Sequence, residues 1–281
     1  MNPGTVRAWI GRSDQRKDQI TAASVRGLWA TLNREGACPE AGAALPALWH
    51  WLYFTPAARQ DQLGVDGHPL LGGFLPPIRL PRRMWAGGRV EFNQPLHVGD
   101  EVTRESRIVD LTIKQGRSGD LVFVTVRHEI GNTRGLAISE VQNIVYRGEA
   151  QSGVLPLAAE KAPTNEAFSR NVVPDPVLLF RYSALTFNAH RIHYDRPYAL
   201  AVEGYPGLVV QGPLIATLLI ELLQHHKPDA VLRRFSFKSV SPLFDTHPFS
   251  LCGRAEGCHD FALWARTGEG AIAMQATAEL A

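Results

Sequence analysis

The chain has 281 residues, of which 45% are hydrophobic and 20% are charged, and its formal net charge is only +2 at pH 7. This composition suits one large domain or two modest ones and excludes an intrinsically disordered chain. Acidic and basic residues are mixed along the chain, without a basic stripe interleaved with aromatic residues. Nucleic acid is therefore not expected as a partner.

The first twenty residues are rich in charged and amide side chains and lack an apolar stretch, which argues against a secretory signal or a membrane anchor. No apolar run approaches the ~20 residues that a helix needs to cross a bilayer. Cys38, Cys252 and Cys258 are too few and too unevenly spaced for a disulfide framework. Cys252, Cys258 and His259 could form a metal cluster, but the lack of a fourth ligand favours cysteines that pack in strands. We expect a reduced, cytoplasmic protein without a bound metal.

The first half of the chain predicts a helix followed by strands. Residues 44–60 (ALPALWHWLYFTPAARQ) predict an apolar helix, and a Gly- and Pro-rich stretch follows at 72–81. Alternating or β-branched runs then predict half-buried antiparallel strands, separated by glycine-containing turns. These strands are expected at 89–92, 101–111, 121–131 and 137–146.

The second half repeats this order. Residues 149–175 contain three prolines and no sustained periodicity, so they are expected to be a linker between domains 1–148 and 176–281. A segment at 177–189 leads to a long apolar helix at 214–225, and four more strands are expected at 233–240, 250–256, 261–267 and 271–280. Periodicity alone therefore predicts an α+β protein with a duplicated order of elements.

Two segments of the second half carry the chemistry. Residues 181–195 (RYSALTFNAHRIHYD) place Asn188, His190 and His193 just after an apolar run, and residues 207–214 (GLVVQGPL) follow. Gly212 and Pro213 form a good helix entrance, because proline is pre-organised for the first helical position. A helix start offers free N–H groups and the positive end of a dipole. A titratable imidazole beside such a start could stabilise an enolate or oxyanion.

These segments resemble the motif of the MaoC-like hydratases and dehydratases of the hotdog fold, an Asp-x-Asn-Pro-(Ile/Leu)-His-x-Asp run followed by His-Gly at the central helix. With His193 at the position of the family histidine, Asn188 takes the aspartate position and His190 the asparagine position. Arg191 takes the proline position, and residues 211–212 take the His-Gly position. The run FNAHRIHYD is most similar to a subgroup with itaconyl-CoA hydratase, mesaconyl-C4-CoA hydratase and mitochondrial-type 3-hydroxyacyl thioester dehydratases.

The resemblance implies a double hotdog, in which two antiparallel sheets each wrap a central helix. The first half shares this layout but lacks the catalytic motif. Hotdog domains usually pair, so a fused pair would pair within one chain. We also expect a homo-oligomer, in the form of a dimer.

Hydration of a 2-enoyl thioester needs water at the β-carbon, a proton at the α-carbon and stabilisation of the enolate oxygen. His193 is the expected general acid/base, and the Gly212 N–H is the expected donor to the oxygen. Asn188 cannot take a proton as the family aspartate does, so we expect its carbonyl to orient the water.

Further residues are expected to contact the substrate. His190 could brace the loop or touch the substrate, Gln211 could line or assist the oxyanion pocket, and Tyr194 could pack or cap the loop. Four arginines are candidates for a substrate carboxylate or for coenzyme A phosphates, because a guanidinium binds both in bidentate fashion: Arg82, Arg83, Arg181 and Arg191. The first two would reach the site from the other half.

The expected activity is the reversible hydration of a short branched dicarboxylic enoyl-CoA to citramalyl-CoA, with itaconyl-CoA as the expected substrate and mesaconyl-C4-CoA as the alternative. No cofactor is expected beyond the coenzyme A thioester of the substrate. The alternatives are a 3-hydroxyacyl-thioester dehydratase of type-II fatty-acid synthesis, a hotdog thioesterase and a non-catalytic acyl-thioester-binding protein. An apolar tunnel would favour the fatty-acid enzyme, and a closed pocket with an arginine would favour the C5 diacid.

Overall fold

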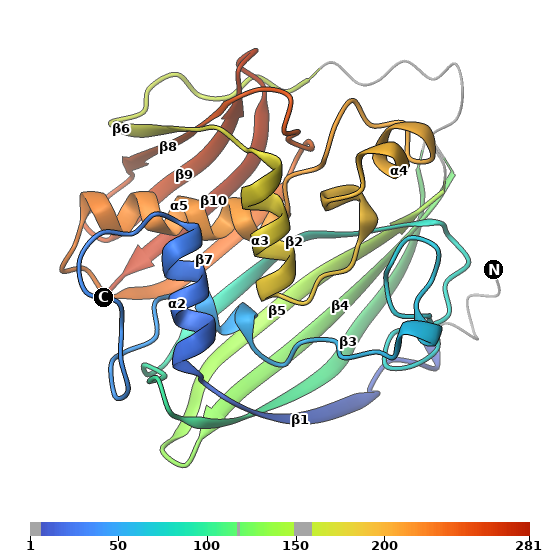
Figure 1. Cartoon of the computed structure of the whole chain (residues 1–281), viewed down its shortest axis with the longest axis horizontal. Coiled ribbons are helices and arrows are strands. Elements are labelled where there is room, and N and C mark those ends of the chain that lie inside the picture. The colour runs from blue at the N-terminus through green and yellow to red at the C-terminus, as the bar shows by residue number, and fades with distance from the viewer. Residues whose placement is uncertain (1–6, 117–118, 149–158) are drawn as a thin grey trace.

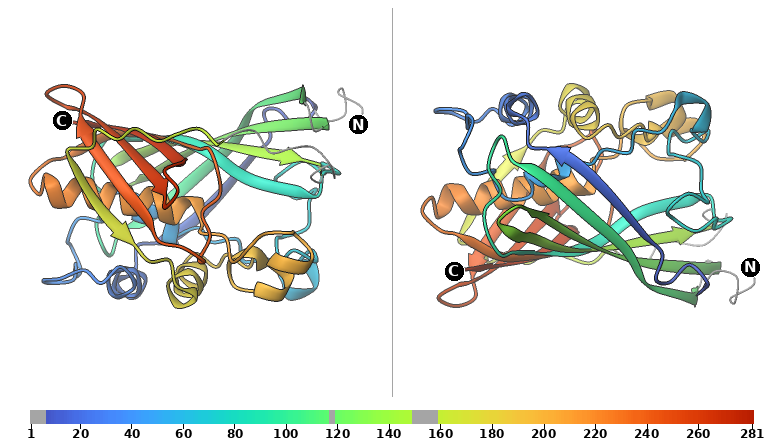
Figure 2. Two further views of the ribbon diagram at one scale, coloured as in Figure 1. Left: turned by 90° about the horizontal axis from the view of Figure 1, so that it is seen from above. Right: turned by 90° about the horizontal axis from the view of Figure 1, so that it is seen from below.

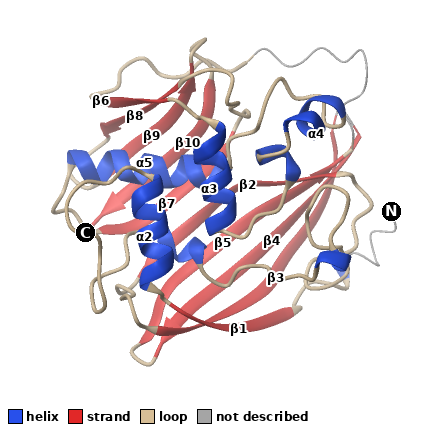
Figure 3. Cartoon of the chain, in the orientation of Figure 1, coloured by secondary structure: helices blue, strands red, loops and turns tan. Residues whose placement is uncertain are grey.

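A computed structural model describes residues 7–116, 119–148 and 159–281. Within these ranges ten strands form one antiparallel sheet in the order β1-β3-β4-β5-β2-β7-β10-β9-β8-β6 (Figures 1 and 3). The strands are β1 (Ser13–Gln19), β2 (Arg82–Phe92), β3 (Glu101–Gly116), β4 (Gly119–Asn132), β5 (Gly135–Arg147), β6 (Phe168–Val172), β7 (Leu232–Ser239), β8 (Phe249–Ala255), β9 (Asp260–Thr267) and β10 (Ile272–Leu280). The eight predicted strands are confirmed, whereas β1 and β6 were not predicted.

The two halves of the chain each contribute five strands and meet at the β2–β7 pair. In this pair Gly87 lies opposite Lys238, and Glu91 lies opposite Arg234. A Cβ atom on Gly87 would stand 2.5 Å from the carbonyl oxygen of Phe237, so the strands approach this closely because glycine occupies the position. The two predicted sheets are thus joined edge to edge.

The helices lie on one face of the sheet, as both views of Figure 2 show. The longest, α5 (Gly212–His226), contacts β6, β8, β9 and β10. Leu214 to Ile220 of this helix are all buried, and a helix that is apolar on nearly all sides must be enclosed by other elements. The predicted central helix of the second half is therefore confirmed.

The helix predicted at 44–60 is wrong. The structure has only a four-residue 3-10 turn there, η1 (Trp49–Leu52). Leu48 and Phe54 flank this turn with φ angles of 68° and 56°, and such left-handed residues end a right-handed helix. The helix of the first half is instead α2 (Ala22–Thr31), which packs against α3 (Pro176–Leu185). Among the described residues, no helix as long as α5 lies over the first-half strands.

The boundary between the halves differs in part from the expected linker. Residues 149–158 lie outside the described residues. Strand β6, which is within the predicted linker, pairs with β8 from Phe168↔Gly253 to Val172↔Phe249. This part of the connection therefore belongs to the sheet of the second half.

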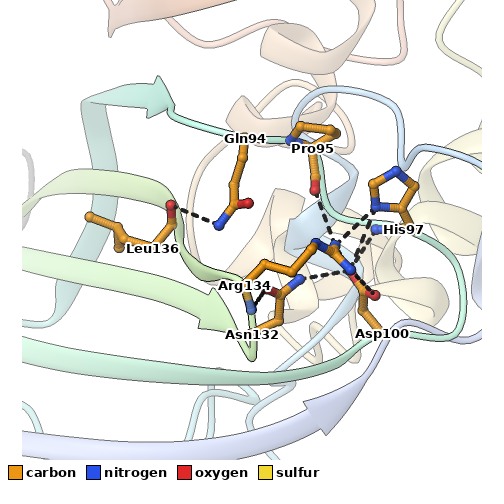
Figure 4. A network of polar contacts seen from close by, with 7 residues as sticks. All are labelled: Gln94, Pro95, His97, Asp100, Asn132, Arg134 and Leu136. Atoms are coloured by element: carbon orange, nitrogen blue, oxygen red, sulfur yellow. Dashed lines mark hydrogen bonds and ion pairs between the residues drawn. The ribbon is translucent and has the colours of Figure 1, made fainter.

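A polar network fastens one end of the first-half sheet (Figure 4). Arg134, in the β4–β5 turn, donates to both carboxylate oxygens of Asp100, at 3.2 and 2.7 Å. Asn132 donates to the same carboxylate at 2.9 Å, and so does the backbone N–H of His97. The network ties the β4–β5 hairpin to the β2–β3 connection.

Three short elements lie near the motif: η2 (Gln60–Gln62), η3 (Arg191–His193) and α4 (Arg196–Ala201). None of the described helices combines the length and apolar character needed to cross a membrane.

Candidate active site

His193 is held in one defined protonation state. Its side chain is nearly buried, with 8% exposure for the residue, and its Nδ1 lies 2.7 Å from the carbonyl oxygen of Val209. A carbonyl can only accept, so Nδ1 carries the proton and Nε2 keeps a lone pair. Burial lowers the pKa of His193 to about 4. The imidazole is therefore a neutral base at pH 7.

Asn188 and Asp195 shape the loop around this histidine. The Asn188 Oδ1 accepts the backbone N–H of His190 at 3.1 Å. The Asp195 carboxylate accepts the N–H of Tyr198 at the start of α4. Such side-chain-to-backbone bonds fix turns and helix starts.

The start of α5 is positioned by Gln211. The residue is 1% exposed, and its Nε2 donates at 2.9 Å to the carbonyl of Leu179 and to the Ser183 hydroxyl, both on α3. Its side chain does not cap α5, and its Oε1 has no partner among the described residues. A Cβ at Gly212 would meet nothing closer than 3.6 Å, so the helix start is not crowded. Gln211 therefore fixes the start of α5 to α3.

A loop of the first half docks on the motif, which the sequence analysis missed. The backbone N–H of Arg191 donates to the Asp66 carbonyl at 2.9 Å, and its Nη1 donates to the Val65 carbonyl at 3.0 Å. Gly67 has φ +88°, and a Cβ there would lie 1.9 Å from the Ala189 carbonyl oxygen. The available signal was Asp66-Gly-His68 between glycines, which predicts a tight turn that carries polar side chains.

This docking brings three histidines together. The His68 and His190 ring centroids are 4.0 Å apart, and those of His190 and His193 are 5.4 Å apart. The His68 Nδ1 lies 2.9 Å from Asp66 Oδ2. Burial lowers the pKa of His190 to about 2 and also lowers the pKa of His68, although Asp66 opposes the latter shift.

Asp66 remains ionised beside these rings. Burial alone would raise its pKa, but the hydrogen bond from His68 and the nearby imidazoles hold it well below its usual range. Asp66, His68 and His190 place one ligand atom each within 4.8 Å of one another. The Asp66–His68 hydrogen bond engages two of the three groups with each other, which is the geometry of a carboxylate-oriented imidazole rather than of a cation site.

A cavity of about 950 Å³ adjoins this cluster. Its wall combines both halves of the chain: Asn188, Gln211 and Pro213 from the second, and His68, Arg83 and Trp85 from the first. His193 is not itself on the wall and lies behind this layer, beside His190. A second cavity of about 760 Å³ shares His68 and Arg83 with the first.

The cavity floor is polar and lies on the first-half sheet. Glu140, which is 2% exposed, accepts from His50 at 3.1 Å, Trp51 at 3.0 Å and Gln142 at 2.9 Å. Although burial opposes it, the hydrogen bond from His50 contributes to lowering the pKa of Glu140 to about 2. The floor also includes Arg104, Ser106 and His128. His128 Nδ1 lies 2.8 Å from Ser106 Oγ, so these two floor residues bond to each other.

The predicted arginines occupy different environments. Arg191 donates to Asp195 Oδ2 at 2.9 and 2.7 Å and stacks 4.1 Å from the Tyr198 ring centre, so it fastens the loop. Arg82 donates to the Glu203 carbonyl and pairs with its carboxylate at 3.4 Å, on the wall of the second cavity.

The other predicted residues, Arg181, Tyr194 and Arg83, also differ in where they lie relative to the two cavities. Arg181 is exposed on α3 and lies on neither cavity wall. The Tyr194 hydroxyl donates to the Ala189 carbonyl, which braces the loop. Arg83 lies on both walls and makes no ion pair with any described residue. Of the four predicted arginines, Arg83 is the one that faces the main cavity.

Comparisons with known proteins agree with this layout. The family model for hydroxyacyl-thioester dehydratase type 2 matches residues 48–245. The chain is 52% identical over 273 residues to mesaconyl-C(4)-CoA hydratase of Chloroflexus aurantiacus, and the match covers 97% of each chain.

Solved structures show the same fold. A MaoC-like dehydratase matches with a TM-score of 0.73 and 14% identity, over 98% of this chain and 99% of the other. A Mycobacterium tuberculosis protein described as a double hotdog matches with a TM-score of 0.61 and 11% identity, over 97% and 96%. The predicted α+β double hotdog is confirmed.

Proposed function

Because the chain belongs to the hydroxyacyl-thioester dehydratase type 2 family, we propose that it reversibly hydrates mesaconyl-C4-CoA to citramalyl-CoA. The predicted resemblance to the MaoC-like hydratases is thereby confirmed, whereas the acyl group is a proposal. The observation that carries the activity is the neutral, oriented imidazole of His193 close to the start of α5.

In the proposed reaction, His193 takes up one proton from water and later delivers it to the substrate. Nε2 of His193 takes a proton from water while the water oxygen adds to the β-carbon. The electron pair of the double bond moves toward the thioester oxygen, where the Gly212 N–H and the α5 dipole stabilise the negative charge. The imidazolium then returns the proton to the α-carbon. No metal ion or redox cofactor takes part in this sequence.

This chemistry favours mesaconyl-C4-CoA over itaconyl-CoA. In the former, the double bond is conjugated with the thioester carbonyl, so addition at the β-carbon produces an enolate oxygen. In the latter, the double bond lies one carbon further from the thioester, and direct addition cannot send electrons to that oxygen. A site that stabilises an oxyanion therefore accelerates hydration of the conjugated isomer. The 52% identical relative carries the matching name.

The cavity supports a dicarboxylic acyl group. A carboxylate without a cation is costly in a buried site, and Arg83 on the wall supplies a guanidinium that has no ion pair among the described residues. The family description nevertheless keeps a 3-hydroxyacyl-thioester dehydratase as the second candidate.

The deciding experiment compares turnover of mesaconyl-C4-CoA, itaconyl-CoA, crotonyl-CoA and a long-chain 2-enoyl-CoA by the purified protein. We expect the highest kcat/KM with mesaconyl-C4-CoA. Fastest turnover of the long-chain thioester would assign the fatty-acid dehydratase, and binding without turnover of any thioester would assign a non-catalytic binding protein.

A paired substitution tests the acyl carboxylate. Arg83→Leu should lower kcat/KM for mesaconyl-C4-CoA by about 10- to 100-fold, the usual worth of a hydrogen bond to a charged group. Crotonyl-CoA lacks the carboxylate and should lose much less. Arg181→Leu, on the exposed face of α3, is the matched control and should change neither rate. Equal losses on both substrates would instead place coenzyme A, and not the acyl carboxylate, at Arg83.

A further inference from the structure

His68 is a polar side chain on the cavity wall to which the hydration step above gives no role. It belongs to the half without the motif, yet its ring packs against that of His190 at a tilt of 40°, and it shares the wall with Asn188. His190 in turn packs against His193, with ring centroids 5.4 Å apart. His68 therefore lies on the cavity wall with only the His190 ring between it and the general base.

The hydrogen bond to Asp66 fixes which ring nitrogen of His68 is available. The ionised carboxylate can only accept, so Nδ1 of His68 carries the proton and Nε2 carries the lone pair. A carboxylate behind an imidazole holds the ring orientation and strengthens its free nitrogen as an acceptor. Asp66 is in turn held on the motif by the Arg191 N–H and by the tight approach of Gly67.

The attacking water has two O–H groups and needs an acceptor for each. His193 offers one unprotonated nitrogen. The Asn188 Oδ1 already accepts the His190 N–H, which leaves it a weaker second acceptor. His68 lies on the cavity wall together with Asn188 and packs against His190, and its Nε2 is unprotonated.

We propose that His68, oriented by Asp66, is a catalytic residue that holds the attacking water by accepting one of its O–H groups while His193 takes the proton of the other. This rests on the hydration activity proposed above. As the oxygen bonds to the β-carbon, the O–H bond directed at His193 breaks, and that proton later reaches the α-carbon. The O–H group held by His68 stays intact and becomes the hydroxyl of the product, so His68 gains and loses no proton.

The test separates acceptance of a hydrogen bond from transfer of a proton. Glutamine places a carbonyl oxygen near the position of Nε2 and can accept a hydrogen bond, but it cannot take a proton. His68→Ala should lower kcat by about 100-fold with a much smaller change in KM, as expected for a misplaced reactant. His68→Gln should have a kcat at least tenfold higher than that of His68→Ala. Asp66→Asn should have a kcat between those of His68→Ala and the wild type. His193→Gln should recover nothing relative to His193→Ala.

Each variant is assayed on the enoyl-CoA that the wild type turns over best, next to the surface variant His247→Gln and with a thermal unfolding midpoint. A wild type without turnover of any enoyl-CoA would contradict the proposed activity itself. An active wild type whose His68→Ala variant keeps more than a third of kcat would overturn the role of His68. So would a His68→Gln variant no better than alanine. Loss of activity on chelation, with recovery in zinc, would assign the Asp66, His68 and His190 group to a cation and also overturn it.

Discussion

At the scale of single residues, the chemistry depends on which nitrogen of each histidine carries the proton. Nδ1 of His193 is tied to a backbone carbonyl, and Nδ1 of His68 is tied to a carboxylate. Both arrangements leave Nε2 as the free basic atom. Because burial lowers both pKa values, the two rings are neutral and can accept hydrogen bonds at pH 7.

Asn188 should act through its carbonyl oxygen. Asn188→Ala removes the acceptor of the His190 N–H and should lower kcat by about 100-fold through loss of geometry. Asn188→Asp keeps an acceptor oxygen and should retain at least about a tenth of the wild-type kcat, measured in the same steady-state assay. If aspartate proves as inactive as alanine, acceptance of the His190 N–H is not what Asn188 contributes to catalysis.

At the scale of elements, the site depends on a loop of one half that docks against the motif of the other. Asp66 and His68 reach the motif only because Gly67 allows the backbone to approach Ala189. Two backbone carbonyls of this loop are bonded by Arg191, which itself is fastened to Asp195. Arg191 thus has a structural role in the joint between the halves.

Gly67→Ala should undo this docking. The new Cβ would overlap the Ala189 carbonyl at 1.9 Å, so the loop must move away and take His68 with it. We expect kcat to fall about as far as in His68→Ala, about 100-fold. Gly72→Ala is the matched control, because Gly72 also has positive φ (+98°) but has no neighbour closer than 3.9 Å. A Gly67→Ala variant that behaves like Gly72→Ala in kcat would show that the docking is not needed.

At the scale of the whole molecule, one continuous sheet supports two different environments. Helix α5 covers the second-half strands, whereas the polar cavity lies over the first-half strands. Several buried histidines result. Burial lowers the pKa of His128 and of His193 to about 4 and that of His190 to about 2.

These histidines should make the fold sensitive to mild acid. Their pKa values lie below the unfolded value of 6.5, so the unfolded chain binds protons first as the pH falls. The contribution of these neutral histidines to the free energy of unfolding is complete above pH 6.5. It is lost as the pH falls toward their folded pKa values. Each contributes a slope of about 1.4 kcal/mol per pH unit in that window. Urea unfolding measured from pH 7.5 to 5 should show this loss. His128→Gln should reduce the slope of the free energy of unfolding against pH by about 1.4 kcal/mol per pH unit, the contribution of one proton. A stability independent of pH in this range would contradict neutral buried histidines.

The sequence by itself determined the features whose signals are local. Alternation and turn residues predicted eight strands, and Gly212-Pro213 predicted the start of α5. The stretch from Asn188 to Gly212 placed an imidazole and a helix start close together because only a short length of chain separates them. The motif therefore indicated the family before any packing was known.

Only the tertiary structure decided the features that join distant segments. The helix expected at 44–60 failed because Leu48 and Phe54 take left-handed backbone angles that apolar periodicity does not reveal. The sequence does not distinguish the roles of Arg191 and Arg83. In the folded chain, Arg191 is paired with Asp195, whereas Arg83 faces the cavity. The Asp66–His68 pair meets the motif only through contacts between the two halves. No local pattern encodes such contacts, because they depend on how the chain closes over long sequence separations.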